Sequence, residues 1–134
     1  MANTKVSIEI VASPDEVWKK IGGFDSLPDW LPYILSSKIS EGGRVRTLTN
    51  PDGSIIIERL EVFSHDEKFY SYSIIQAPFP VTYYLSTIKV RESEKGSIVE
   101  WSGEFSPENV SEKEAINIFY DIYKEGLEAL QNQF

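Results

Sequence analysis

Glu58 is the residue whose type and position could most directly support chemistry. It interrupts the apolar stretch of residues 54–63, and because residues two apart along a strand share a face, it falls on the same face as Ile56 and Leu60. If this face turns inward, the carboxylate points into apolar surroundings, where it needs a cation, hydroxyl groups or a raised pKa. Arg46 and tyrosine hydroxyls are the candidate partners. The alternative is that Glu58 lies on a solvated strand surface.

Other catalytic arrangements find little support in the residue types present. His65 is the only histidine, and its polar neighbours in residues 64–67 favour a solvated turn over a place beside a serine nucleophile. One histidine and scattered carboxylates lack the spacing of a metal site, and no glycine-rich loop leads from a strand into a helix as in phosphate-binding loops. The absence of cysteine excludes disulfides, thiolate zinc sites and cysteine nucleophiles. We therefore expect no metal and no cofactor.

The charge balance narrows the class of partner. The chain has 21 acidic and 13 basic residues and a net charge of −8, which disfavours nucleic acids and anionic membrane surfaces as partners. No apolar run approaches the roughly 20 residues of a membrane span, and the first residues lack the apolar region of a signal peptide. We expect a cytoplasmic protein without membrane insertion. Aromatic residues make up 13% of the chain and would suit a pocket with apolar walls and polar tips.

Alternation of apolar and polar residues predicts seven strands, and these must position any site. The segments between them are turn sequences such as Asn50-Pro-Asp-Gly, and short connections between successive strands imply an antiparallel meander. The predicted strands cover residues 5–11, 33–40, 44–49, 54–63, 68–76, 82–92 and 97–106.

Two short helices are predicted after the first strand and one long helix at the C-terminal end. Ser13 and Ser111 each stand three residues before a glutamate, which is the pattern of a capping box. Gly22 ends the first helix, and residues 26–30 form one further turn before Pro32. Apolar residues at spacings of three and four give the last helix, about 20 residues long, one wide apolar stripe. The sequence therefore predicts a single α+β domain over residues 1–134, with this helix covering the sheet.

Five sequence fragments, in this order, resemble those of the START/Bet v 1-like (SRPBCC) superfamily. Within it they resemble small bacterial proteins of the polyketide cyclase/dehydrase and lipid-transport type. The resemblance implies a helix-grip fold, in which a curved seven-stranded antiparallel sheet wraps around the long C-terminal helix. The fragments are residues 10–18 (IVASPDEVW), 24–32 (FDSLPDWLP), 57–61 (IERLE), 99–103 (VEWSG) and 123–127 (YKEGL).

Part of the chain is also similar to the plant abscisic-acid receptors. Their likeness lies in residues 57–75, but the receptors' gate loop is replaced here by residues 50–53 (NPDG) and their latch loop by residues 76–80 (QAPFP). The resemblance thus implies a shared fold without a shared hormone.

The superfamily resemblance implies a cavity between the sheet and the last helix, and strand parity predicts the side chains that face it. A bulge could reverse the face of residues 82–92, and Gly126 is alternatively a close-packing glycine. The predicted mouth loops are alternatively plain turns. We expect the cavity to be lined by Ile56, Glu58, Leu60, Tyr70, Tyr72, Ile74, Tyr83, Leu85, Trp101, Phe119, Tyr123 and Gly126. The mouth loops would carry Pro51, Gly53, Pro78, Phe79 and Pro80.

Three functions remain open at this point. The leading hypothesis is binding, carriage or sensing of a small hydrophobic or amphipathic molecule, such as a lipid, isoprenoid or aromatic compound, by a monomer or homodimer. The second is an aromatase/cyclase-type enzyme acting on a polyketide-like substrate, with Glu58 as acid or base beside Tyr72, Tyr83 or Tyr123. The third is a protein-interaction module whose cavity is filled by side chains. The lack of other catalytic groups favours the first.

Overall fold

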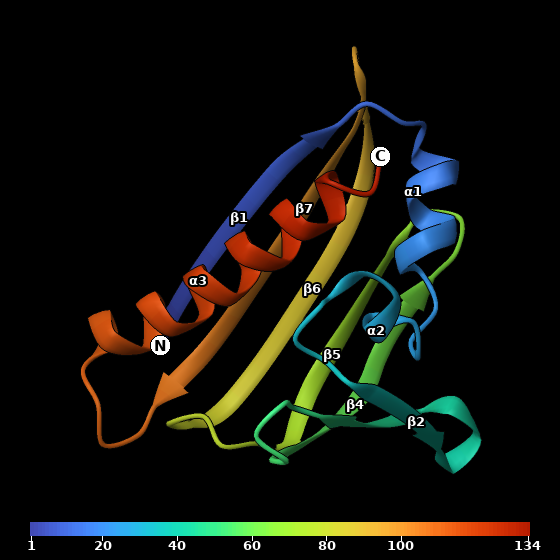
Figure 1. Ribbon diagram of the computed structural model, residues 1–134. Coiled ribbons are helices and arrows are strands. Elements are labelled where there is room, and N and C mark those ends of the chain that lie inside the picture. The colour runs from blue at the N-terminus through green and yellow to red at the C-terminus, as the bar shows by residue number, and fades with distance from the viewer.

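Seven strands form one antiparallel sheet in the computed structural model, which describes all of residues 1–134. The sheet order is β1-β7-β6-β5-β4-β3-β2, so that only β1 pairs with a strand remote in sequence (Figure 1). The seven-stranded antiparallel sheet predicted from the sequence is confirmed. The strands are β1 (Ala2–Ile10), β2 (Ser36–Ser40), β3 (Val45–Thr49), β4 (Ile55–Ser64), β5 (Phe69–Gln76), β6 (Val81–Ser93) and β7 (Gly96–Pro107).

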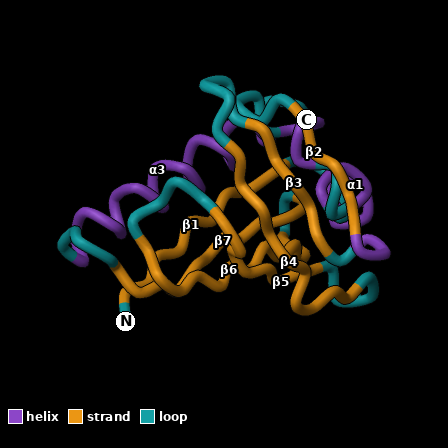
Figure 2. Tube along the Cα trace, turned by 90° about the horizontal axis from the view of Figure 1, so that it is seen from below, coloured by secondary structure: helices purple, strands orange, loops and turns teal.

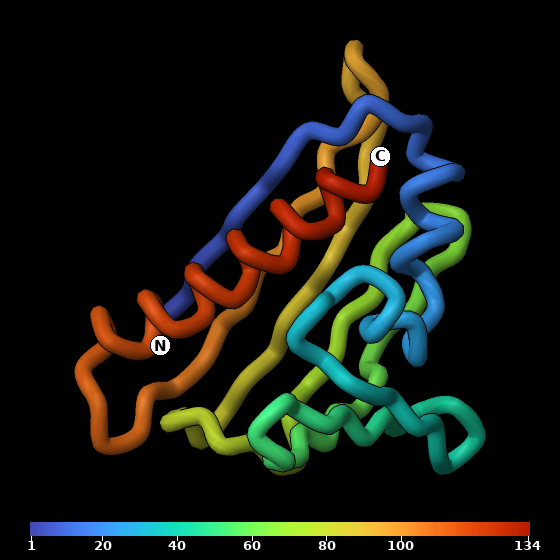
Figure 3. The backbone as a smooth tube through the Cα atoms, viewed as in Figure 1, coloured from blue at the N-terminus to red at the C-terminus, as the bar shows by residue number.

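The long C-terminal helix α3 (Glu112–Gln131) lies along β1 and β7 (Figures 1 and 3). Its first turn is capped as predicted, because Ser111 Oγ accepts a hydrogen bond from the backbone N–H of Glu114 at 3.1 Å. Burial of one leucine or phenylalanine contributes roughly 1.5–3 kcal/mol, so the apolar stripe is what holds the helix on the sheet. That stripe consists of Ala115, Phe119, Tyr123, Gly126, Leu127 and Leu130.

Two short helices, α1 (Pro14–Ile21) and α2 (Leu27–Trp30), cover the other half of the same sheet face (Figure 1). Ser13 Oγ accepts from the backbone N–H of Glu16 at 3.2 Å and starts α1, and a backbone bond from Gly22 to Trp18 closes it at 2.7 Å. A single 3₁₀ turn, η1 (Glu41–Gly43), joins β2 to β3. Seen from below in Figure 2, the strands curl around the side that carries the helices, as a helix-grip fold requires.

Two strands begin three residues away from their predicted starts. β1 begins at Ala2 instead of residue 5, because Ala2 already pairs with Phe105 of β7. β2 begins at Ser36 instead of residue 33, because the chain after α2 makes one more turn, in which the N–H of Ile34 donates to the carbonyl of Leu31 at 3.2 Å. This turn brings Tyr33 to α3, where its hydroxyl donates to the carbonyl of Ile122 at 3.1 Å.

None of the helices is both long and apolar enough to cross a lipid bilayer.

Candidate functional site

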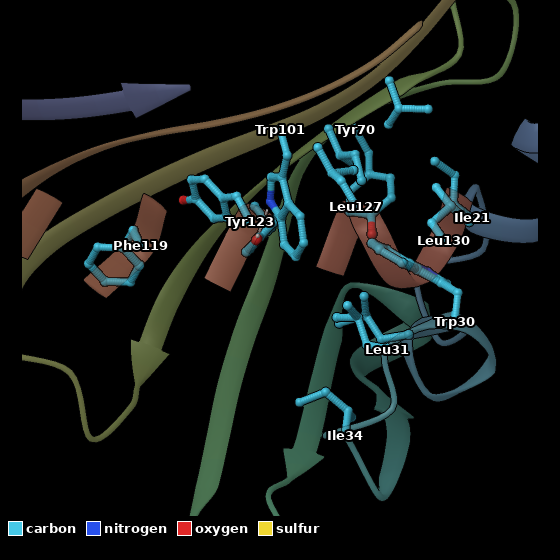
Figure 4. Packing of buried hydrophobic residues seen from close by; sticks show 14 of the residues in the cluster. Ile21, Trp30, Leu31, Ile34, Tyr70, Trp101, Phe119, Tyr123, Leu127 and Leu130 are labelled. Carbon is cyan, nitrogen blue, oxygen red and sulfur yellow. Dashed lines mark hydrogen bonds between the residues drawn. The ribbon is translucent and has the colours of Figure 1, made fainter. Parts of the chain in front are cut away.

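A cavity of about 190 Å³ lies between α3, the segment around α2 and the inner face of the sheet. Its walls are apolar and aromatic except at Asn50 and Glu58. The close-up in Figure 4 shows Trp101, Tyr123 and Phe119 on one side and Leu31 and Ile34 on the other. The lining residues are Leu27, Leu31, Tyr33, Ile34, Leu48, Asn50, Ile56, Glu58, Tyr72, Ile74, Phe79, Tyr84, Trp101, Phe119, Ile122 and Tyr123.

The structure brings together eight of the side chains that the sequence placed in or around the cavity. They come from β4, β5, the loop before β6, β7 and α3, so each of these elements supplies part of the wall. The eight are Ile56, Glu58, Tyr72, Ile74, Phe79, Trp101, Phe119 and Tyr123.

The inward face predicted for β6 is wrong. Tyr83 is 41% exposed, and its hydroxyl donates to Glu104 Oε1 at 3.1 Å on the outer face of the sheet, which Leu85 shares. The register with β7 decides this, because directly opposed residues on antiparallel strands point to the same side and Tyr84 stands opposite the buried Phe105. Tyr84, not Tyr83, therefore lines the cavity.

Three further predicted residues lie near the cavity without lining it. Tyr70 is buried in the core, 5.7 Å from the ring of Phe24, and Leu60 is half-buried against the same core. Gly126 matches its alternative interpretation as a close-packing glycine. A Cβ there would come within 2.7 Å of Leu31 Cδ2 and 2.8 Å of Trp101 Cζ3.

The two predicted mouth loops differ in what they contribute. Pro51 and Gly53 lie in an exposed turn, where Gly53 has a φ of 86°, and from this loop only Asn50 reaches the cavity. In the other loop Pro78 is exposed and Pro80 half-buried, whereas Phe79 packs edge-on against Phe119 with ring centroids 5.2 Å apart and lines the cavity.

Sequence reasoning missed the side chains that close the cavity opposite the sheet. Leu27, Leu31 and Ile34 recur at spacings of four and three, which was the available signal, but Pro32 ended the predicted helix and residues 33–40 were assigned to a strand. The other missed lining residues are Tyr33, Leu48, Asn50, Tyr84 and Ile122.

Glu58 is held by the fully buried Arg46 of the neighbouring strand, the partner considered from the sequence. The two residues stand opposite each other in the β3–β4 register, and Arg46 Nε donates to Glu58 Oε1 at 2.8 Å. Arg46 Nη2 lies 2.8 Å from the same oxygen. Burial raises the pKa of the Glu58 carboxyl, whereas the charge and hydrogen bond of Arg46 act in the opposite direction.

Each nitrogen of the Arg46 guanidinium already has a partner within the protein. Its Nη1 donates to the carbonyl of Phe24 at 2.9 Å and to the hydroxyl of Tyr70 at 3.3 Å. Its Cζ lies 4.2 Å from the ring centroid of Phe24 and 4.7 Å from that of Tyr72. Burial would lower the pKa of Arg46, but the influence of Tyr70, Glu58 and Tyr72 outweighs it and raises the pKa, so the side chain stays charged.

A second polar group of the wall is a hydrogen-bonded cluster on β5, β6, β7 and α3. Trp101 Nε1 donates to the hydroxyls of Tyr72 and Ser86, each at 3.1 Å, and the hydroxyls of Tyr84 and Tyr123 are hydrogen-bonded to each other. Burial raises the pKa of Tyr123 to about 12 and the pKa values of Tyr72 and Tyr84 well above the ordinary value. At neutral pH these hydroxyls keep their protons and act as hydrogen-bonding groups, not as bases.

His65 lies apart from the cavity, in the turn between β4 and β5. It is exposed, as the sequence indicated, but its Nδ1 accepts a hydrogen bond from Trp18 Nε1 at 3.0 Å and thereby ties α1 to the sheet. No group of three or more His, Asp or Glu side chains in the chain is arranged to hold a metal ion.

Comparison with known proteins agrees with this architecture. A family described as "Polyketide cyclase / dehydrase and lipid transport" matches residues 1–134. The chain is 29% identical to "MLP-like protein 423" of Arabidopsis thaliana, in an alignment that covers 75% of this chain and 73% of that protein.

Two solved bacterial structures are similar over nearly their whole length. The protein XoxI of Bacillus cereus is 63% identical, with a TM-score of 0.98 over 100% of this chain and 96% of that one. A protein of Bacillus thuringiensis is 61% identical, with a TM-score of 0.97 over 99% of this chain and 98% of that one.

Proposed function

This chain belongs to the polyketide cyclase/dehydrase and lipid transport family, and we propose that its cavity binds a small hydrophobic or amphipathic molecule. The observation that carries the proposal is the open volume of about 190 Å³ inside apolar and aromatic walls. An engineered apolar cavity of about 150 Å³ in another protein binds benzene, whereas drug-sized ligands occupy roughly 300–1,000 Å³. We therefore infer a ligand of one or two rings, or an isoprenoid or acyl chain of similar volume.

The polar groups of the wall support binding more than catalysis. The tyrosine hydroxyls hold their protons at neutral pH, and Arg46 fixes Glu58 in place. A protein that carries or senses its ligand needs an apolar space and an entrance. Phe79 is the part of the wall that a loop movement would displace, because it lies in the loop between β5 and β6 and packs on Phe119 of α3.

A cyclase- or dehydrase-type reaction is the second candidate, favoured by the place of Glu58 in the wall beside Tyr72. A carboxylate and a phenol facing one substrate could move a proton between them. If Glu58→Gln left the turnover of an active substrate unchanged, this mechanism would be wrong. The third hypothesis, a cavity filled by side chains, is disfavoured by the open volume.

A pair of tryptophan substitutions on neighbouring residues tests the binding function. Ile74 lines the cavity, whereas Ile75 points to the other face of β5 and is 50% exposed. The purified protein is incubated with cell extract and examined by native mass spectrometry for retained small molecules. We expect the wild-type protein and Ile75→Trp to retain the same molecule and Ile74→Trp to lose it, because the indole occupies the cavity. Retention of nothing by the wild-type protein, or equal retention by both variants, would refute the proposal.

A further inference from the structure

Tyr72, Tyr84, Tyr123, Ser86 and Trp101 form the tyrosine cluster. The direction of its hydrogen bonds determines which hydroxyl groups remain free to bind a ligand. Ser86 donates to the carbonyl of Ser102 at 2.7 Å, so its hydroxyl hydrogen is used there. Tyr123 in turn donates to Ser86 Oγ at 3.4 Å, and Tyr84 must therefore be the donor in its bond with Tyr123. Tyr84 thus offers a ligand only lone pairs.

Tyr72 is the one hydroxyl of the cluster that keeps its hydrogen available. It accepts the hydrogen bond from Trp101 Nε1 at 3.1 Å and is the donor in no side-chain hydrogen bond within the protein. Both Tyr72 and Tyr84 line the cavity. The wall therefore presents one unused hydroxyl donor, on β5.

Glu58 contributes an unused acceptor on the neighbouring strand. Both contacts from Arg46 end on Oε1, and Oε2 accepts no hydrogen bond from the protein. Oε2 is not fully enclosed by protein atoms, and Glu58 lines the cavity. Glu58 stands opposite Ile74 in the β4–β5 register, which makes it a diagonal neighbour of Tyr72. The free acceptor and the free donor thus come from neighbouring positions on two adjacent strands of the wall.

No positive charge faces the cavity to balance an anionic ligand. No lysine, arginine or histidine is among the lining residues, and the guanidinium of Arg46 is fully buried and engaged by Glu58, Phe24 and Tyr70. A ligand carboxylate would meet the Glu58 carboxylate in a low-dielectric space, where like charges repel strongly. An ammonium group would suit Glu58 but has no lone pair for the hydrogen of Tyr72.

We propose that the cavity selects a neutral ligand with an apolar body and one hydroxyl group, an alcohol or a phenol, and excludes carboxylates. The hydroxyl donates to Glu58 Oε2 and accepts from the Tyr72 hydroxyl, while the apolar body occupies the rest of the cavity towards Phe79 and Phe119. This inference rests on the proposed binding function and specifies the chemical class of the ligand.

Three probes that share one ring system test the selection on the wild-type protein. Isothermal titration calorimetry at pH 7 compares 2-naphthol, 2-naphthoate and naphthalene. We expect 2-naphthol to bind about tenfold or more tightly than 2-naphthoate, with naphthalene between them. If naphthalene binds but 2-naphthoate binds as tightly as 2-naphthol, the selection is refuted while the binding function stands. If none of the three binds, the proposed function itself fails.

Matched tyrosine variants test the assigned contacts. Tyr72→Phe removes the free donor and leaves Trp101 bonded to Ser86, whereas Tyr83→Phe removes a hydroxyl from the outer face. We expect Tyr72→Phe to weaken the binding of 2-naphthol by roughly two- to tenfold and to leave the affinity for naphthalene unchanged, because one neutral hydrogen bond is lost. Tyr83→Phe should change neither. An equal effect of the two variants on 2-naphthol would refute the role of Tyr72.

Glu58→Gln tests the repulsion of anions. Removing the negative charge should raise the affinity for 2-naphthoate and narrow its difference from 2-naphthol. An unchanged ratio in a folded variant would show that Glu58 does not set the preference. If the variant does not fold because Arg46 has lost its partner, the wild-type comparison and the tyrosine variants still decide the proposal.

Discussion

Arg46→Met is expected to lower the free energy of unfolding by about 3–5 kcal/mol, because it leaves the Glu58 carboxylate buried without a partner. Arg46 is fully buried, with both of its Glu58 contacts at 2.8 Å, and the substitution also removes the hydrogen bond to the carbonyl of Phe24. Methionine fills much of the same volume, so the loss comes from the unpaired polar groups and not from an empty space.

Urea unfolding followed by tryptophan fluorescence measures this change. With a slope of about 1–3 kcal/mol per molar urea, the midpoint should fall by about 1 M or more. Arg91→Met is the matched control, because Arg91 is half exposed and its Nε lies 3.8 Å from Glu100, and such surface pairs contribute about 0–1 kcal/mol. If Arg46→Met cost no more than Arg91→Met, the buried pair would not have the importance assigned to it.

The loss in Arg46→Met should also depend on pH. Burial raises the pKa of Glu58, and without Arg46 the opposing attraction is gone, so the folded pKa lies further above the unfolded value of about 4.3. A folded state with a raised pKa binds the extra proton, so stability is highest below the unfolded pKa and falls as pH rises through the folded one. The difference from the wild-type protein should therefore be smaller near pH 4.5 than at pH 7. A constant difference would refute the assignment of the loss to the charge of Glu58.

Three further expectations concern helix packing, high pH and capping. Gly126→Ala should lower the urea midpoint, because the new Cβ would approach Trp101 to 2.8 Å. Overpacking costs about 1–3 kcal/mol, which exceeds the roughly 1 kcal/mol gained in helix propensity. A higher midpoint would refute the close contact. Between pH 10 and 12 the contribution of Tyr123 should lower the free energy of unfolding by roughly 1.4 kcal/mol per pH unit. The reason is that the pKa of Tyr123 in the folded protein is raised to about 12, so the unfolded chain loses this proton first. An equal fall in Tyr123→Phe would contradict this. Ser111→Ala should cost about 1 kcal/mol in thermal or urea unfolding through the lost cap of α3, and no loss would exclude that cap.

Strand faces could be read from the sequence only where alternation was unambiguous. In β7 the apolar residues Val99, Trp101 and Phe105 alternate with Glu100 and other polar residues, and the structure buries that apolar set. Such a strand has one plausible inner face, so local sequence decides its orientation.

In β6 both faces carry aromatic, aliphatic and polar residues, and alternation gave the wrong one. Ser86 is fully buried although polar, because it bonds to Ser102 and Trp101 across the β6–β7 pair and within the core. Only the register that places Tyr84 opposite Phe105 fixes the face, and that register is a property of two strands together.

The cavity wall opposite the sheet was missed for a related physical reason. Leu31 precedes Pro32-Tyr33 and Ile34 follows it. Leu27, Leu31 and Ile34 have helical spacing, but the proline interrupts that pattern, so local sequence does not decide where the last two side chains point. The tertiary contact of the Tyr33 hydroxyl with the carbonyl of Ile122 holds this segment against α3. Long-range contacts of this kind are not visible in local propensity.

Stability and ligand selection can be separated at the Arg46–Glu58 pair. A buried ion pair replaced as a whole by apolar residues of similar volume is often neutral or stabilising, because neither charge then has to be desolvated. The double variant Arg46→Met/Glu58→Leu should therefore unfold at a higher urea midpoint than Arg46→Met alone, although it too lacks the hydrogen bond to the Phe24 carbonyl. It should still bind naphthalene but lose the preference for 2-naphthol over naphthalene, because the acceptor that receives the hydroxyl is gone. If the double variant kept that preference, Glu58 would not be the group that recognises the ligand hydroxyl.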